Sequence, residues 1–228
     1  MSELDPVTPA AADAHAAALH VAQVLRDRIV HGQIRAGDRI VERRVSAELA
    51  VSRTPVREAL KLLEADGLIR ISRNKGAQVT GLTAEEALHL FQVIGVLEGL
   101  AARRLATEAD AGVMERLEGL HDRILFHYRR SQIEPYFEAN SAAHDLIVAS
   151  CGNPVLVGHH QRTMLMARRG RFMAIMSPSR WAQSVEEHEI LMQALRARDA
   201  DAAAAIWATH LRHTGETLAA VLRDEGRP

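Results

Sequence analysis

The chain of 228 residues has a single cysteine, few aromatic residues and no long apolar run. Cys151 cannot form an internal disulfide, which excludes a disulfide-stapled scaffold and favours a small buried apolar side chain at this position. The first residues, MSELDPVT, are acidic and lack the apolar core of a signal peptide, and no stretch approaches the ~18 apolar residues that span a bilayer. We therefore expect a cytoplasmic protein that does not enter the membrane.

The composition is that of a globular protein with much helix. Hydrophobic residues make up 47% and charged residues 25% of the chain, which separates it from disordered sequences. Aromatic residues are only 4%, whereas Ala, Leu, Arg and Glu are abundant, and this mixture favours helices. The length suits two domains of unequal size.

A formal net charge of -1 hides an uneven distribution. Residues 14–80 hold 12 Lys and Arg against 7 Asp and Glu, whereas residues 81–228 hold 16 against 19. The smaller part of the chain is therefore basic, as expected if that part contacts phosphate and the rest does not.

Hydrophobic periodicity and turn residues divide the first third of the chain into short elements. Residues 1–13 show no helical period and are expected to form a loose arm. Three helices followed by a β-hairpin with a polar tip predict a winged helix-turn-helix over residues 14–80. The expected elements are helices at 14–31, 42–50 and 52–67 and a hairpin at 68–79.

From residue 81 to the end of the chain only helical patterns occur. Prolines and a Gly-Asn pair lie at or near the expected helix boundaries. The fold class is therefore mainly α, with an all-α helical-bundle ligand-binding domain over residues 81–228. The expected helices are 84–107, 110–130, 133–150, 154–176, 178–197 and 199–222.

The segment AVSRTPVREALKLLEAD places Arg53, Arg57 and Lys61 one helical turn apart, on the face opposite an apolar stripe. In a major groove, the two arginines would lie in the first two turns, where an Arg side chain can pair both acceptors of guanine. Lys61 is better placed for a phosphate. The hydroxyls of Ser52 and Thr54 and the helix N-terminus also suit phosphate.

The alternative is a solvated cationic helix face with partners such as Glu58 and Glu64. The short helix before it and the basic hairpin after it favour DNA binding. Because one such helix reads only a few base pairs, a homodimer on a palindromic operator is expected.

The stretch VERRVSAELAVSRTPVREALKLLEADGLI resembles the DNA-binding signature of the GntR family of bacterial transcription regulators, over about residues 17–80. The resemblance implies that Arg43, Arg53 and Arg57 contact double-stranded operator DNA. It also implies that the tip of the hairpin enters the minor groove, with residues Arg73, Asn74, Lys75 and Gly76. Many relatives have Gly where this chain has Ala50, and a positive φ there would cost up to about 1 kcal/mol.

Most of the twelve histidines show no shared spacing, and packing or surface exposure is the interpretation for these eight: His15, His20, His31, His89, His121, His127, His159 and His160. A better pattern places Asn140 and His144 at i and i+4, with His188 and His210 on the last two helices. Three imidazoles and an oxygen inside a bundle suit Zn²⁺ or a similar ion. Scattered structural histidines are the alternative.

The segments FEANSAAHDLIVASCGNPVL, EEHEILMQALRARDADAA and WATHL resemble the FCD ligand-binding domain of the FadR subfamily, over about residues 84–215. Six helices rather than seven place it near the VanR-like branch. The resemblance implies a homodimer and a divalent metal (Zn, Ni or Mn) on Asn140, His144, His188 and His210. It also implies a small organic acid as effector, whose carboxylate would bind at the metal's free positions.

Two positions depart from the FCD pattern. Asn140 stands where Asp is common, so the site lacks one anionic ligand. Ile94 stands four residues before Glu98, where relatives often carry Arg. Arg103 and Arg104 on the same helix are interpreted as solvated salt-bridge partners.

These features predict a metabolite-responsive transcription regulator, a repressor rather than an enzyme. One alternative is a repressor for which the metal ion itself is the signal. Another is a metal-dependent hydrolase with a DNA-binding domain, in which Glu187 or Glu189 beside His188 would act as general base. The chain has no HExxH arrangement and no nucleophile in a recognisable setting, which counts against the hydrolase.

Overall fold

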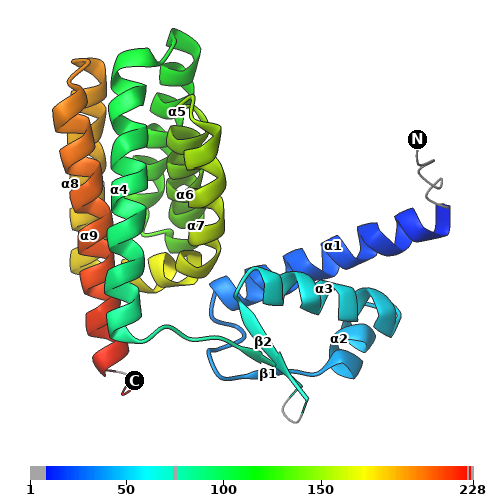
Figure 1. Ribbon diagram of the computed structural model, residues 1–228. Helices are drawn as coiled ribbons and strands as arrows, with labels where there is room; N and C mark the ends of the chain where they lie inside the picture. The colour runs from blue at the N-terminus through cyan, green and yellow to red at the C-terminus, as the bar shows by residue number, and fades with distance from the viewer. Residues whose placement is uncertain (1–8, 74–75, 225, 227–228) are drawn as a thin grey trace. The chain divides into compact units, whose positions relative to one another are not determined.

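The computed structural model describes residues 9–73, 76–224 and 226, with side chains from residue 15 onward (Figure 1). The chain forms two compact units, an N-terminal unit of residues 1–81 and a C-terminal unit of residues 82–228. The elements of the N-terminal unit are α1 (Pro9–Val30), β1 (Arg39–Ile40), α2 (Glu42–Glu48), α3 (Arg53–Ala65), β2 (Ile69–Ser72) and β3 (Gly76–Val79). The fold class predicted from the sequence, a winged helix-turn-helix and a helical domain, is confirmed.

The prediction of a loose arm over residues 1–13 is wrong for residues 9–13, because α1 begins at Pro9. Residues 1–8 lie outside the described part of the chain. Pro9 occupies the first helical position, where its missing N–H costs nothing, and three alanines follow it. Alanine has the highest intrinsic helix propensity, so these residues extend the helix without an apolar period of their own.

The wing is a three-stranded antiparallel sheet in the order β1-β3-β2. The hairpin of β2 and β3 was predicted from the sequence. In the structure, Ile69 of β2 pairs with Val79 of β3. The sequence predicted no element between residues 31 and 42, yet Ile40 of β1 pairs with Ala77 and is buried. Two residues are too few for a period-of-two pattern to appear in the sequence, so this edge strand could not be recognised.

The core of the N-terminal unit lies between α1, α3 and the sheet. Leu25 and Ile29 of α1 and Val56, Leu60 and Leu63 of α3 are almost fully buried. This packing fixes one side of α3 against the protein and leaves its opposite side, which carries the cations, in solvent.

The described part of the C-terminal unit forms six helices, as predicted, and each boundary lies within two residues of the expected one. α4 packs along most of its length against α9, and the two helices lie side by side in Figure 1. Gly95 and Gly99 allow this approach, because a Cβ at either position would lie 3.1–3.2 Å from a backbone oxygen of α9. The helices are α4 (Ala84–Glu108), α5 (Ala111–Arg129), α6 (Ile133–Ala149), α7 (Pro154–Ile175), α8 (Pro178–Arg196) and α9 (Ala200–Asp224).

Among the described residues, no helix is long and apolar enough to cross a membrane.

Candidate DNA-binding face and candidate metal site

The turn between α2 and α3 sets the start of the helix that carries the cationic stripe. Ala50 has a φ of 52°, so this position does need the left-handed conformation that suits glycine. Ser52 is the N-cap residue of α3, as predicted, but its side chain makes no capping hydrogen bond. The exposed hydroxyls of Ser52 and Thr54 therefore lie at the N-terminal end of α3, where an anion is favoured.

The predicted cations line one groove of the N-terminal unit. Arg53, Arg57 and Lys61 are more than half exposed on α3. The groove has a volume of about 560 Å³ and lies between α3, the start of α2 and the sheet. Five cationic residues and one acidic residue line it: Arg39, Arg43, Arg53, Arg57, Lys61 and Glu42.

Glu42, the acidic residue of the groove, accepts hydrogen bonds from both arginines of α3. Oε2 of Glu42 accepts hydrogen bonds from Nη2 of Arg53 and from Nε of Arg57, each at 3.0 Å. Partial desolvation raises the pKa of Glu42, but the hydrogen bonds and charges of the two arginines hold it below its usual value. The partner of the arginines is thus Glu42, which the sequence analysis did not identify.

The other residues predicted to bind DNA belong to the same N-terminal unit. Lys61 pairs with Glu58 at 2.9 Å, as the solvated-face alternative proposed, whereas Glu64 accepts from the backbone N–H of Ile71 and does not pair with the stripe. Arg73 and Gly76 are exposed at the hairpin, and Gly76 has a φ of 68°. The other two predicted tip residues, Asn74 and Lys75, lie outside the described residues.

In the C-terminal unit, the structure brings together the three histidines singled out by the sequence. One ring nitrogen from each of His144, His188 and His210 lies within 4.8 Å of the others, and all three side chains are buried. Asn140 lies one turn before His144 on α6 and is also buried, and its Oδ1 has no hydrogen-bond partner. Trp207 of α9 stacks on His210, with ring centroids 4.6 Å apart, and covers the cluster with an apolar surface.

A buried carboxylate of α4 orients the first histidine. Nδ1 of His144 donates to Oε2 of Glu98 at 2.5 Å, and Nε2 of His160 donates to Oε1 of the same residue at 2.8 Å. With its proton on Nδ1, His144 presents the lone pair of Nε2, an atom that is buried without a partner. His160, interpreted from the sequence as a packing residue, is a core residue bound to this carboxylate.

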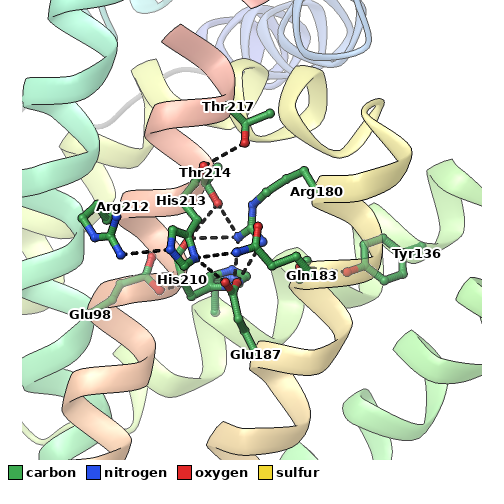
Figure 2. A network of polar contacts seen from close by, with 12 residues as sticks. Glu98, Tyr136, Arg180, Gln183, Glu187, His210, Arg212, His213, Thr214 and Thr217 are labelled. Atoms are coloured by element: carbon green, nitrogen blue, oxygen red, sulfur yellow. Dashed lines mark hydrogen bonds and ion pairs between the residues drawn. The ribbon is translucent and has the colours of Figure 1, made fainter. Parts of the chain in front are cut away.

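A second carboxylate orients the third histidine, in the network of Figure 2. Nδ1 of His210 donates to Oε2 of Glu187 at 2.7 Å. Arg180 donates to the same oxygen at 2.8 Å, and His213 donates to Oε1 at 2.5 Å. Arg180 also donates to the carbonyl oxygen of His210 and to the hydroxyl of Thr214, each at 2.9 Å. Both oxygens of Glu187 are therefore occupied.

Burial keeps the imidazoles of the cluster neutral near pH 7. It lowers the pKa of His144 to about 4 and that of His210 to about 3, and it lowers the pKa of His188 well below the usual value. Although burial raises the pKa of Glu187, the hydrogen bond from His210 and the charge of Arg180 lower it to about 2. Neutral imidazoles next to ionised carboxylates form the arrangement in which histidines bind metals.

The donor set fits a divalent metal ion. In the part of the chain that the structure describes, Nε2 of His144, Nε2 of His188 and Oδ1 of Asn140 are all buried without a hydrogen-bond partner, and a cation would satisfy each of them. The hydrolase alternative is not supported, because Glu187 is held by three donors and Glu189 is exposed. Ile94, where relatives often carry Arg, is fully buried on α4.

Glu98 has a signal in the sequence of α4, although the spacing of the histidines does not reveal it. Phe91, Ile94, Ala101 and Leu105 are buried on α4, and Glu98 lies on the same helical face. An acidic residue in the middle of an apolar stripe must be paired when the helix is buried. The spacing of the histidines predicts the candidate metal ligands, but it does not identify the carboxylates that bind them.

Comparisons with known proteins agree with both units. Residues 17–79 match the family model described as "Bacterial regulatory proteins, gntR family", and residues 89–213 match the model "FCD domain". An uncharacterized HTH-type transcriptional regulator of Bacillus subtilis, YdhC, is 27% identical over 204 residues, covering 89% of this chain and 91% of the relative. The HTH-type transcriptional repressor RspR of Escherichia coli is 27% identical over 197 residues, covering 86% of each.

Solved structures share the fold. Escherichia coli McbR/YncC superimposes with a TM-score of 0.78 at 18% identity, over 92% of this chain and 99% of that one. A putative GntR transcriptional regulator from Rhodococcus sp. RHA1 has a TM-score of 0.73 at 25% identity, over 89% and 97%. The chain belongs to the GntR family of bacterial regulatory proteins, with an FCD domain, and is a DNA-binding transcriptional regulator rather than an enzyme.

Proposed function

We propose that this regulator is a repressor that binds a palindromic operator as a homodimer and loses or gains DNA affinity when a small organic acid binds at or near a metal. In this proposal residues 14–80 bind DNA, and residues 81–228 bind the effector and form the dimer. Because the operator is bacterial DNA, the protein would act in the cytoplasm. The groove lined by five cations on the N-terminal unit is the observation that carries the proposal.

The position of each cation suggests its role in the complex. Arg53 and Arg57 lie in the first two turns of α3, the part of a recognition helix that reaches base edges. Arg43 lies on α2 at the same groove, whereas Arg73 lies at the wing and suits the minor groove. Lys61, one turn further along α3, is placed for a phosphate. We expect the wing to add affinity for many sequences rather than specificity.

Alanine substitutions separate these roles. Arg53→Ala or Arg57→Ala should cost about 1–3 kcal/mol of operator binding and relax preference at one base pair, because a bidentate contact to guanine is lost. Lys61→Ala should instead weaken all DNA and reduce the salt slope by about one. The assay is fluorescence anisotropy with a selected operator and with random DNA of equal length.

The control for these variants is Arg196→Ala, which removes an equally exposed, salt-bridged arginine from α8 in the other unit. It should leave both affinities unchanged. If Arg53→Ala and Arg57→Ala weaken operator and random DNA equally, both arginines contact phosphate and base readout by α3 is refuted.

The metal site of this proposal consists of His144, His188, His210 and Asn140, with Zn²⁺, Ni²⁺ or Mn²⁺ as candidates. When bound, the ion would supply a Lewis acid able to accept a carboxylate oxygen. Elemental analysis of tag-free protein tests occupancy, and His188→Ala should release most of the metal and lower thermal stability. A metal content far below one ion per chain, which does not rise when these ions are added, would refute the site.

The dimer is supported by an apolar stripe on α4. Val93, Val96 and Leu100 follow helical spacing, and they are 53%, 68% and 43% exposed in the single chain. A surface of this kind is typical of a face that another protein covers. Sedimentation of the full chain tests this directly: a monomer at the concentrations that bind operator would refute the homodimer.

A further inference from the structure

Two arginines are almost completely buried in the C-terminal unit, and they differ in their partners. Arg180 is 2% exposed and Arg171 is 3% exposed. The guanidinium of Arg180 is bound by the carboxylate of Glu187, a backbone carbonyl and a hydroxyl. Such a set of acceptors is what a buried cation requires.

Arg171 of α7 lacks such a set. Among the described residues, Nη1 forms one hydrogen-bond contact, with the sulfur of Met164 at 3.7 Å, and Nη2 is buried with no hydrogen-bond partner. Arginine stays protonated in proteins, so this side chain holds a positive charge in the interior of the helical unit. Burying a charge without a hydrogen-bonded partner is strongly unfavourable, which makes this guanidinium unusual.

The two carboxylates whose charges act on the Arg171 guanidinium do not form ion pairs with it in the described part of the chain. Burial lowers the pKa of Arg171, whereas the negative charges of Glu98 and Asp145 raise it. Both carboxylates therefore interact electrostatically with this guanidinium. The two oxygens of Glu98 already accept from His144 and His160, and Asp145 is exposed to solvent. No ion pair joins either acid to Arg171 in the part of the chain that the structure describes.

Arg171 lies on α7, which packs against α6 and α9, the helices that carry His144 and His210. Its positive charge also contributes to lowering the pKa of His144 and of His188. Several buried polar atoms of this unit lack a partner among the described residues, including Nε1 of Trp207 and Nε of Arg180, and two sets of them bear on ligands. Nε2 of His144, Nε2 of His188 and Oδ1 of Asn140 are acceptors, which a metal cation satisfies. Nη2 of Arg171 is a buried donor without a partner among the described residues, and because the guanidinium is charged, an anion is the acceptor that compensates it best.

We propose that Arg171 is the residue that receives the carboxylate of the effector, by the bidentate pairing that a guanidinium forms with a planar anion. This inference rests on the proposed function in one respect, that the effector is an organic acid. It adds the residue that recognises the acid group and the element, α7, that responds to it. Since α7 packs against α4 and α9, carboxylate binding acts on the helices that hold Glu98 and His210.

The experiment compares Arg171→Met with Arg180→Met in the full chain, using acetate and formate as the probes. Both anions are small enough to enter any carboxylate site, and they are titrated at constant ionic strength against chloride while the thermal midpoint is recorded. Acetate or formate should raise the midpoint of the wild-type protein in proportion to occupancy. Arg171→Met should bind them about 10-fold to 100-fold more weakly, as expected for the loss of a charged hydrogen-bonded pair.

The midpoint without added anion provides the second readout. Arg171→Met removes an uncompensated buried charge, so its midpoint should equal or exceed that of the wild type. Arg180→Met leaves Glu187 without its cation, so its midpoint should fall. A fall for Arg171→Met as large as that for Arg180→Met, including failure to fold, would show a structural arginine and overturn the proposal.

The other outcomes are equally decisive. Failure of both anions to stabilise the wild type, or equal stabilisation of wild type and Arg171→Met, overturns the proposal, as does stabilisation by inorganic phosphate alone. Metal content and operator affinity of each variant are measured in parallel. If the wild type holds no metal yet binds acetate through Arg171, the metal part of the proposed function fails while this inference stands.

Discussion

Glu98→Gln is the sharpest test of how the candidate metal site is built. The carboxylate is fully buried, and each of its oxygens accepts from one imidazole, Nδ1 of His144 and Nε2 of His160. Glutamine has the same shape but offers one acceptor and one NH₂ donor. One of the two imidazoles must then face a donor. If that ring is His144, its proton moves to Nε2, and the lone pair that would bind the metal is lost.

The size of the effect follows from this role. Loss of a partner that orients a metal-binding histidine lowers metal affinity about 10-fold to 100-fold, or roughly 1.4–2.7 kcal/mol. Even when the amide oxygen faces His144, the imidazole loses a negatively charged partner and becomes a weaker ligand. We expect this loss in a competition titration of Zn²⁺ against a chromophoric chelator at neutral pH.

The matched control is Glu216→Gln, which replaces an exposed glutamate of α9 that pairs with Arg212. It should bind Zn²⁺ as the wild type does. A folded Glu98→Gln chain with unchanged Zn²⁺ affinity would refute the argument that Glu98 fixes the tautomer of His144.

Glu42→Gln removes the acidic residue from the cationic groove and frees two arginines, each held by an exposed pair worth roughly 0.2–1 kcal/mol. DNA should therefore bind about 2-fold to 30-fold tighter in fluorescence anisotropy, whereas weaker operator binding would mean that Glu42 orients the arginines on DNA. Ala50→Gly relieves a φ of 52° and should raise the free energy of unfolding by up to about 1 kcal/mol in urea; a loss of stability would contradict strain in this turn. The folded-state pKa values of His144 and His210 are about 4 and about 3, against about 6.5 in the unfolded chain. The unfolded state thus binds protons first as the pH falls, and the metal-free C-terminal unit should lose stability from about pH 6.5 down to about pH 3. A thermal midpoint that stays constant over this range would refute the assignment of neutral buried imidazoles.

The architecture of the C-terminal unit could be predicted because its signals are local. Proline and glycine near the boundaries and an apolar period within each helix are properties of adjacent residues. The positive φ of Ala50 was raised only as a condition by the resemblance, because many relatives have Gly at this position. The N-terminal errors have local causes too, since the alanines after Pro9 carry propensity without a period, and β1 is too short to show one.

The partners of the site residues could not be predicted, because they depend on how helices pack. Glu98 and His144 are 46 residues apart, and Arg180 and His210 are 30 apart. Spacing along one helix identified Asn140 and His144 as neighbours, but no spacing relates α4 to α6. What the sequence does offer is the presence of charged residues on apolar helix faces, at Glu98, Arg171 and Arg180, each of which must find a partner inside the fold.

The burial of the histidines also bears on which molecule is the signal. The three candidate ligand side chains are nearly inaccessible to solvent and come from α6, α8 and α9, so an ion bound there would join helices that are distant in sequence. Exchange of such an ion requires the bundle to open, which makes it a poor reporter of a fluctuating metal concentration. An organic acid that pairs with Arg171 does not need to displace the ion. On the proposed function, the metal would act as a fixed part of the bundle, and the carboxylate would shift the equilibrium between arrangements of its helices, by as much as it prefers one arrangement over the other.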